Sequence, residues 1–269
     1  MNLNRSLTPN RRSRERILPA GLRGFRRTAL AFLVSVLVAG SVRAQQSRPL
    51  LRLENENVYG FVLFDLLEAA PTQVGGPLQW DMIGSIGKTY DRFWIKSDGD
   101  LSTAERGGEM EFQALYSRLI APYWEAQAGV RFDVGYTGAR TRTRAQLVVG
   151  LEGLAPYWFE LEPAVFVSQD GDVSAALTGT YDLLVTQRLV LQPRLDVAAA
   201  LQEVEAWNVG SGLNSIGLGV RLRYEIRREF APYLGLGWTR LTGGTADLAR
   251  RGGERTSTLS LVLGVRLWR

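Results

Sequence analysis

The stretch EMEFQALYSRL, residues 109–119, decides the fold class, because polar and apolar side chains alternate along it. Glu109 and Glu111 fall on one face of an extended segment, and Met110 and Phe112 fall on the opposite face. Successive side chains of a β-strand point to opposite sides of its sheet. The alternation therefore predicts a strand with one polar face and one apolar face.

The same alternation recurs along the rest of the chain and predicts twelve strands. Each strand is close to the length of about 9–11 residues that a tilted strand needs to cross a membrane. We therefore expect an all-β fold, a transmembrane outer-membrane β-barrel of about 12 antiparallel strands with a polar interior and a lipid-facing exterior. The expected strands are 58–67, 79–86, 90–98, 108–119, 123–132, 143–154, 157–167, 173–184, 188–200, 215–226, 232–241 and 257–268.

The connections between the expected strands alternate in length. Outer-membrane barrels combine short periplasmic turns with longer external loops, so both termini are expected on the periplasmic side. Short turns are expected at 120–122, 155–156, 185–187 and 227–231, and longer polar loops at 133–142, 168–172, 202–214 and 242–256. A soluble β-sandwich is the alternative, but it would bury its apolar face in a core instead of flanking it with aromatic residues. The aromatic residues at the short-turn ends are Tyr123, Trp124, Tyr157, Trp158, Phe230 and Tyr233.

The start of the chain predicts export. Residues 1–27 carry eight arginines against a single acidic residue, Glu15, and an apolar run follows at 28–40 before small residues that end at Ala44. This order is typical of a cleavable secretion signal, and the apolar run is shorter than the about 20 residues of a membrane-spanning helix. The expected segments are a signal peptide at 1–44, a short polar periplasmic lead-in at 45–57 and the transmembrane β-barrel at 58–269.

Composition excludes two further classes of function. The leader holds nine of the 32 Lys and Arg residues and one of the 27 Asp and Glu residues, so the mature chain keeps 23 basic and 26 acidic residues, a net charge of −3. We therefore expect no nucleic-acid partner, which would require a basic surface. The chain contains no Cys and no His. Because His is the usual general base and triad partner, we expect no enzyme.

The polar face of the expected strands carries interleaved charges. Arginines and carboxylates could pair across the lumen as a structural network, or surplus carboxylates could attract metal ions along a cation path. Glu109 and Glu111, and likewise Glu160 and Glu162, are two positions apart and point the same way, so these four are the candidate metal ligands. The other expected lumen charges are Asp81, Asp98, Glu125, Glu152, Asp182, Asp196, Glu225, Arg92, Lys96, Arg131, Arg144, Arg194, Arg221, Arg223 and Arg266.

Several long stretches carry a resemblance to a known family. They are DRFWIK (91–96), EFQALYSRLIAPYWEAQAG (111–129), GLEGLAPYWFELE (150–162), YDLLVTQRLVLQPRL (181–195), GSGLNSIGLGVRLRYEIRREFAPY (210–233), TADLAR (245–250) and GVR (264–266). The chain resembles the copper-resistance outer-membrane protein B family over most of residues 58–268. The resemblance implies copper ion as the bound or transported metal, a location in the cell outer membrane, and action beside a periplasmic multicopper oxidase.

The chain departs from the family pattern at two places. Members of the family commonly carry a Met- and His-rich segment ahead of the barrel, whereas residues 45–57 contain neither residue. Barrels of this type usually end in a Phe that the barrel assembly machinery reads, whereas here Arg269 follows Trp268 at that position. The expected partners are thus outer-membrane lipid, the barrel assembly machinery and a multicopper oxidase.

Three functions fit these observations. The first is copper homeostasis or resistance, in which the barrel binds excess copper ions or passes them out of the periplasm. The alternative is a non-specific small-solute or divalent-cation channel that kept the fold without copper specificity. A third is a structural or adhesion barrel that works through the 242–256 segment.

Overall fold

The structure, a computed structural model, describes residues 57–71, 77–102, 107–138 and 140–269. The expected signal peptide and nearly all of the expected lead-in lie outside the described residues. The strands are β1 (Tyr59–Ala69), β2 (Leu78–Gly87), β3 (Asp91–Ser102), β4 (Gly107–Ala121), β5 (Trp124–Thr137), β6 (Arg140–Ala155), β7 (Phe159–Ser168), β8 (Val173–Thr180), β9 (Leu183–Leu184), β10 (Leu189–Ala200), β11 (Gly212–Tyr224), β12 (Phe230–Leu241) and β13 (Ser257–Trp268).

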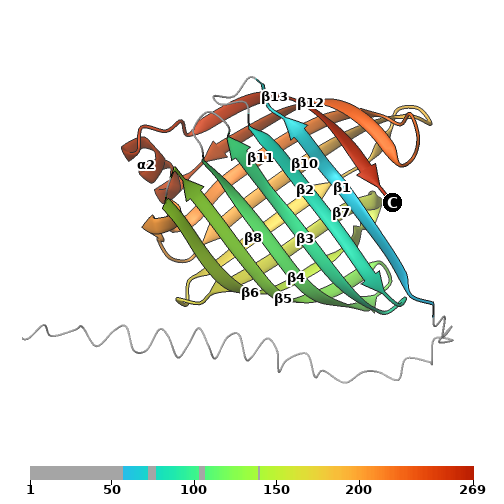
Figure 1. Cartoon of the computed structure of the whole chain (residues 1–269), viewed down its shortest axis with the longest axis horizontal. Coiled ribbons are helices and arrows are strands. Elements are labelled where there is room, and N and C mark those ends of the chain that lie inside the picture. The colour runs from blue at the N-terminus through green and yellow to red at the C-terminus, as the bar shows by residue number, and fades with distance from the viewer. Residues whose placement is uncertain (1–56, 72–76, 103–106, 139) are drawn as a thin grey trace, which may run out of the picture. The chain divides into compact units, whose positions relative to one another are not determined.

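Twelve long strands close into a barrel, which confirms the expected fold. Neighbouring strands pair antiparallel in chain order, and β13 pairs with β1 to close the ring. The two-residue β9 continues the ladder of β8 along β10. The ladder is interrupted between them opposite Pro193 of β10, because proline has no N–H to donate. Figure 1 shows the tilted strands from the side.

The two ends of the barrel differ in their connections. At one end, β1 begins at Tyr59 and β13 ends at Trp268, and the turns are short; we call it the terminal end. The opposite end carries the helix α2 (Gly243–Arg251), and we call it the α2 end. Among the described residues, no helix is long and apolar enough to cross a membrane.

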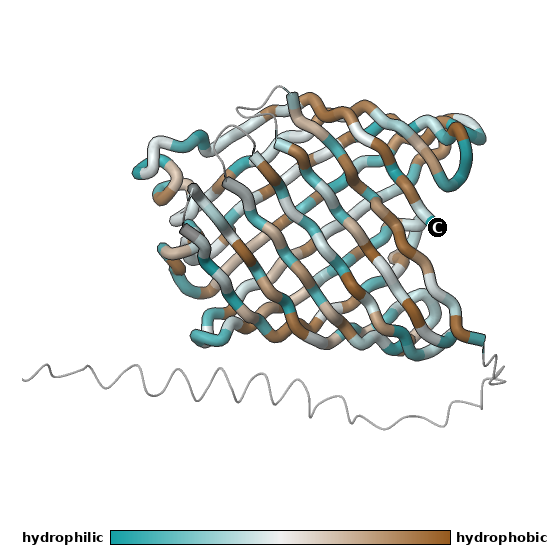
Figure 2. The backbone as a smooth tube through the Cα atoms, in the orientation of Figure 1, coloured by the Kyte–Doolittle hydropathy of each residue, from teal (hydrophilic) through white to brown (hydrophobic). Residues whose placement is uncertain are grey.

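Alternation along the strands separates an apolar outer face from the lumen. Ile95 points outward and its side chain is 58 % exposed, whereas the adjacent Trp94 points into the lumen and is 5 % exposed. Figure 2 shows hydrophobic and hydrophilic stretches alternating along the strands. The lumen is not uniformly polar, because Trp94, Leu115, Val148 and Phe166 form a buried apolar cluster inside it. The exterior thus suits lipid, while charged and apolar groups share the interior.

A bulge in β1 changes which of its residues face the lumen. The register between β1 and β2 shifts between Phe64 and Leu66, and a bulge inserts one residue into the strand. Asp65 and Leu66, although adjacent in sequence, both line cavities of the lumen. The residues beyond the bulge therefore follow the opposite parity, and this change turns Glu68 inward.

The expected loop at 133–142 is wrong, because β5 and β6 extend through it and meet at a tight turn. Gly138 adopts a φ of +60° in that turn, a conformation that glycine accepts at little cost. The strands continue because Asp133 is buried by partners in the lumen. The 202–214 and 242–256 segments are connections, as expected, but they are folded: the first contains the 3-10 helix η2 (Glu205–Trp207), and the second contains α2.

The helix α2 is docked onto the β10–β11 connection. Thr245, Ala246 and Ala249 are its buried residues. The Thr245 hydroxyl accepts hydrogen bonds from the Gly210 N–H at 2.9 Å and from the Asn214 amide at 2.7 Å. A Cβ atom at position 210 would lie 2.2 Å from the Thr245 nitrogen, so only glycine permits this approach. The two connections therefore form one packed layer at the α2 end.

The short turns of the terminal end hold exposed aromatic residues in an unusual backbone conformation. Tyr123, Tyr157 and Trp158 have φ values of 68°, 69° and 68°, and positive φ is rare for bulky residues. Their side chains are exposed. The sequence expectation for Tyr233 is wrong: its side chain is buried, and its hydroxyl donates to Glu68 in the lumen at 2.9 Å. Its strand register, rather than its nearness to a turn, determines its direction.

Candidate functional site in the barrel lumen

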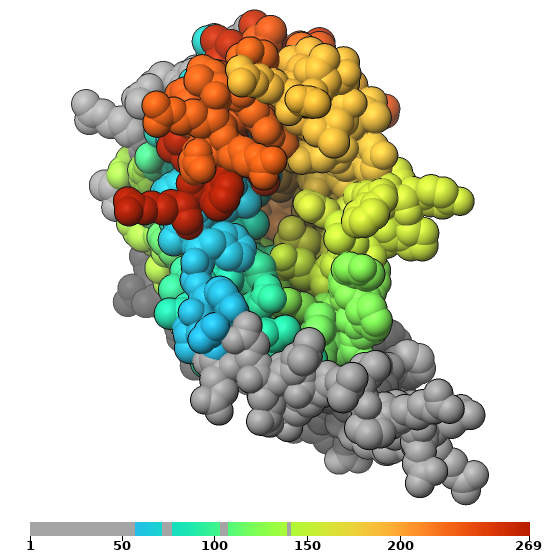
Figure 3. Space-filling model, turned by 90° about the vertical axis from the view of Figure 1, so that its right-hand side faces the viewer, coloured from blue at the N-terminus to red at the C-terminus, as the bar shows by residue number. Residues whose placement is uncertain are grey.

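Two cavities occupy the lumen, one toward each end. The cavity at the α2 end has a volume of about 490 Å3, and its lining includes Glu109 and Trp207. The cavity at the terminal end has a volume of about 820 Å3, and its lining includes Arg92 and Glu125. Figure 3 looks onto the terminal end, where the surface is hollowed at the centre. Six charged residues line both cavities and form what we call the waist: Asp81, Asp98, Glu111, Arg131, Arg194 and Asp196.

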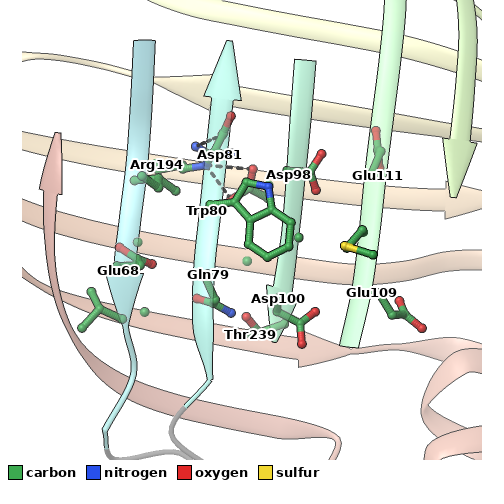
Figure 4. Close-up of a pocket in the computed structure, with 18 of the residues that line it drawn as sticks. Glu68, Gln79, Trp80, Asp81, Asp98, Asp100, Glu109, Glu111, Arg194 and Thr239 are labelled. Atoms are coloured by element: carbon green, nitrogen blue, oxygen red, sulfur yellow. Dashed lines mark hydrogen bonds and ion pairs between the residues drawn. The ribbon is translucent and has the colours of Figure 1, made fainter. Parts of the chain in front are cut away.

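A row of carboxylates crosses four adjacent strands at the waist. Asp81 of β2 pairs in register with Asp98 of β3, Asp98 pairs with Glu111 of β4, and Glu111 pairs with Asp133 of β5. Figure 4 shows Asp81, Asp98 and Glu111 on neighbouring strands. Directly opposed residues have Cβ atoms about 4.5–5.5 Å apart, and like charges at that spacing repel. The row is therefore stable only because cations from other strands reach it.

Arg194 supplies one of these cations from the opposite side of the barrel. It lies on β10, five strands from β2 around the closed ring. Its Nη1 donates to Asp81 at 3.1 Å and lies 4.0 Å from a carboxylate oxygen of Asp65, and its Nε donates to Asp196 at 3.1 Å. Figure 4 shows Arg194 beside Asp81. The side chain thus crosses the lumen between the two cavities.

Asp133 gathers the other cations of the row. It accepts from Arg131 at 2.6 Å, from Arg144 at 2.8 Å and from the Gln146 amide at 2.6 Å. Arg131 also contacts Glu111 at 2.5 Å. Charge-assisted hydrogen bonds satisfy both oxygens of Asp133, so this end of the carboxylate row is held in place.

Asp98 differs from its neighbours in the row. Among the described residues it makes no hydrogen bond and no ion pair, and its side chain is open to both cavities. It stands between Asp81 and Glu111, each of which has an arginine partner. Asp98 is therefore the waist carboxylate available to a mobile cation.

The α2 end of the lumen is covered by an aromatic residue held between two arginines. The guanidinium carbons of Arg142 and Arg144 each lie 4.7 Å from the ring centroid of Trp207. Arg142 also donates to the Ala206 carbonyl oxygen at 2.7 Å and pairs with Glu109. These contacts tie the β10–β11 connection to the barrel wall over the α2-end cavity.

The terminal-end cavity has its own ion pairs. Lys96 contacts Glu152 at 2.8 Å and Glu162 at 2.7 Å, so one ammonium group joins two carboxylates from different strands. Glu125 accepts from the Trp94 indole N–H at 3.2 Å and pairs with Arg92 at 3.3 Å. Arginine–carboxylate and lysine–carboxylate pairs thus also line the lumen between the waist and the terminal end.

The structure separates the four candidate metal ligands into their two pairs. Glu109 lines the α2-end cavity, Glu111 at the waist lines both cavities, and Glu160 and Glu162 line the terminal-end cavity. Three have cationic partners, and Glu160 accepts from the Thr180 hydroxyl at 3.2 Å. Within the described ranges, no three Asp, Glu, His or Cys side chains are grouped so that they could hold a metal ion. Cation binding by these four residues stays a prediction.

Sequence reasoning missed four charged residues of the lumen, one of which, Asp100, lies on β3 beyond the expected end of that strand at residue 98. Glu68 is 2 % exposed and forms two hydrogen bonds with Arg221, at 2.8 and 3.0 Å, but the bulge hid its inward direction. Asp65, which pairs with Arg266 at 2.7 Å, stands at that bulge. Asp133 was assigned to a loop, although its parity continues that of Arg131 and was a signal that the strand goes on.

The fold and the lumen together define a class of protein. A closed antiparallel barrel with an apolar exterior and a lumen lined by ion pairs is an outer-membrane β-barrel, located in the cell outer membrane. The family model described as "Copper resistance protein B precursor (CopB)" matches residues 58–269. The chain belongs to the copper resistance protein B family.

Two relatives, at 42 % and 35 % identity, agree with this assignment. "Copper resistance protein B" of Escherichia coli is 42 % identical over 207 residues, which are 77 % of this chain and 68 % of that protein. "Copper resistance protein B homolog" of Pseudomonas syringae pv. tomato is 35 % identical over 217 residues, 81 % of this chain and 72 % of that protein. Among solved structures, the NanC porin is 12 % identical with a TM-score of 0.49 and covers 78 % of this chain and 99 % of its own. The KdgM porin is 10 % identical with a TM-score of 0.46 and covers 78 % and 98 %.

Proposed function

We propose that the barrel passes excess copper ions out of the periplasm through its lumen, without catalysing a reaction. The observation that carries the proposal is Asp98, a waist carboxylate without a cationic partner among the described residues, open to the cavities on both sides. Conduction requires a contact strong enough to admit an ion and weak enough to release it. A single carboxylate flanked by Asp81 and Glu111 meets that requirement, because each neighbour is already held by an arginine.

The chemistry of the lining favours divalent copper as the cargo. Thiolate and thioether ligands select Cu(I), whereas the waist offers carboxylate oxygens. Among divalent first-row metals, Cu2+ binds a given oxygen or nitrogen site most tightly. A multicopper oxidase in the periplasm, the partner implied by family resemblance, would supply copper in this oxidised form.

The first test is cell-associated copper after a copper challenge. It compares a deletion strain with the same strain complemented by wild type, by Asp98→Asn or by the quadruple variant Glu109→Gln, Glu111→Gln, Glu160→Gln and Glu162→Gln. Asp247→Asn is the matched control, because Asp247 lies exposed on α2 and pairs only locally with Arg250 among the described residues. We expect raised copper in the deletion strain. Wild type and the control should restore the normal copper content, whereas Asp98→Asn and the quadruple variant should not.

The outcomes separate the functions. Copper content that the deletion leaves unchanged would contradict a copper role. Carboxylate oxygens also bind other divalent cations, and on this rests the alternative of a non-specific divalent-cation channel. That alternative predicts that the deletion raises cell-associated zinc and copper alike. The heat-modifiable mobility of each variant on a gel verifies that its barrel has folded.

A further inference from the structure

The two cavities of the lumen meet at Arg194, which alone among the waist residues reaches across the barrel from β10 to β2. Its three carboxylate neighbours, Asp65, Asp81 and Asp196, come from three different strands. Its side chain is largely buried in the middle of the lumen, so an ion that moves between the cavities must pass beside it.

The waist has an excess of negative charge. Its two arginines face four carboxylates, and Arg131 is held on one wall by Glu111 and Asp133 and by stacking on the Phe166 ring, with its guanidinium carbon 4.6 Å from the ring centroid. Arg194 stacks on no aromatic ring among the described residues: its Nε pairs with Asp196 of its own strand, and its Nη1 extends across the lumen to Asp81. It is therefore the positive charge that a passing ion meets most directly.

We infer that Arg194 determines both the width and the charge selectivity of the pathway. Its guanidinium crosses the lumen as a bar that excludes larger solutes. Its positive charge partly offsets the field of Asp81, Asp98 and Asp196, so that the pathway prefers cations less strongly than these carboxylates alone would make it. The inference rests on the proposed function in taking the lumen as the route, but it concerns inorganic cations in general and does not depend on copper being the cargo.

The test is the reversal potential and single-channel conductance of the full-length protein in planar bilayers under a KCl gradient. Arg194→Gln should raise the conductance and increase the cation-to-anion permeability ratio by about thirtyfold. One unit charge about 4 Å from a passing ion at the dielectric constant of water changes the permeability of that ion about fivefold, and its removal raises the cation permeability and lowers the anion permeability by that factor. Arg194→Lys should keep a ratio near that of wild type, because it keeps the charge.

A double variant separates charge from width. Arg194→Gln with Asp81→Asn removes one positive and one negative charge, so the permeability ratio should return toward the wild-type value while the conductance stays raised. A residue with a merely structural role would not restore the permeability ratio while leaving the conductance raised. Arg92→Gln is the matched control, because Arg92 pairs with one carboxylate, Glu125, and lines only the terminal-end cavity; its ratio should change little.

Several results would overturn the inference. One is a folded Arg194→Gln barrel whose permeability ratio equals that of wild type. Another is an Arg92→Gln barrel whose permeability ratio changes as much as that of Arg194→Gln.

If wild type conducts no current, conductance that appears in Arg194→Gln supports the inference that Arg194 narrows the pathway. If neither folded protein conducts, the inference is overturned. If Arg194→Gln does not fold, Arg194→Lys with Asp81→Asn provides the test, since its ratio should fall below wild type. A changed KCl selectivity without any copper phenotype would refute only the copper cargo.

Discussion

The two ends of the barrel are built on different principles. The terminal end closes each hairpin with a few residues, and its aromatic side chains at Tyr123 and Tyr157 are exposed. The α2 end instead joins segments far apart in the chain: Glu68 binds Arg221, Trp207 lies between Arg142 and Arg144, and Thr245 binds Gly210. The connections at the terminal end are thus local turns, whereas long-range contacts hold the connections of the α2 end over the lumen. Substitutions should therefore cost more at the α2 end.

The largest effect is expected from Glu68→Ala. It would leave Arg221 buried without its counter-charge and remove the acceptor of the Tyr233 hydroxyl. Breaking a buried pair by removing one partner costs about 3–5 kcal/mol. Urea unfolding in detergent micelles measures the free energy of unfolding. Glu225→Ala at the terminal end is the control, because Glu225 lies 3.7 Å from Arg223, which keeps Asp182. Equal losses in both variants would contradict the difference between the ends.

Gly210→Ala should detach α2 from the β10–β11 connection. The added Cβ would lie 2.2 Å from the Thr245 nitrogen, so the helix must move. Overpacking of this kind costs about 1–3 kcal/mol, and limited proteolysis should then cut within residues 243–256. Gly84→Ala is the control, because the nearest atom to its Cβ, the Phe61 carbonyl oxygen, lies at 3.7 Å. Resistance of the Gly210 variant to protease would show that α2 does not depend on this approach.

Trp207→Ala should loosen the cover of the α2-end cavity. Cation–π contacts are worth about 0.5–1 kcal/mol each at exposed sites, and Trp207 makes two of them. We expect a loss of about 1–2 kcal/mol and faster cleavage of residues 201–211. The matched change at the terminal end is Trp158→Ala, which should leave this cleavage rate unaltered. If both variants are cleaved at the wild-type rate, the two arginines do not hold the connection.

The smallest effect is expected from Tyr157→Asn, and its sign is opposite. Tyr157 has a φ of 69° and an exposed side chain, and asparagine tolerates this conformation better than other side chains. A gain of up to about 1 kcal/mol is expected in urea unfolding, because the backbone at this turn is strained whatever the side chain packs against. Tyr136→Asn, at a residue in the regular part of β5, is the control and should give no gain. Destabilisation by Tyr157→Asn would mean that the aromatic side chain outweighs the strain.

Much of the barrel wall could be predicted from alternation alone. A two-residue period assigns each side chain to lipid or lumen wherever a strand is regular, as in β4, where Glu111 and Phe112 point to opposite faces. The same rule failed at β1, because the bulge before Leu66 reverses the parity and no residue type announces it. It also failed at Tyr233, where closeness to a turn suggested a girdle and the register placed the ring in the lumen.

The types of residue in the candidate site could be predicted from the sequence, but not which of them pair with each other. The sequence indicated a lumen rich in carboxylates and arginines, and Glu109, Glu111, Glu160 and Glu162 do line its cavities. It did not indicate that Asp98 would be left without a partner among the described residues. That property depends on the reach of Arg131 and Arg194 from other strands.

The number of long strands, the apolar exterior and the charged interior could be read from the sequence, because these depend on spacing along one segment. Which charges meet depends on how the strands are arranged in space. Closure of the ring sets Arg194 against Asp81, 113 residues away, and Arg221 against Glu68, 153 residues away. Ion pairing falls off with distance in space and not along the chain, so the waist exists only once β13 has paired with β1.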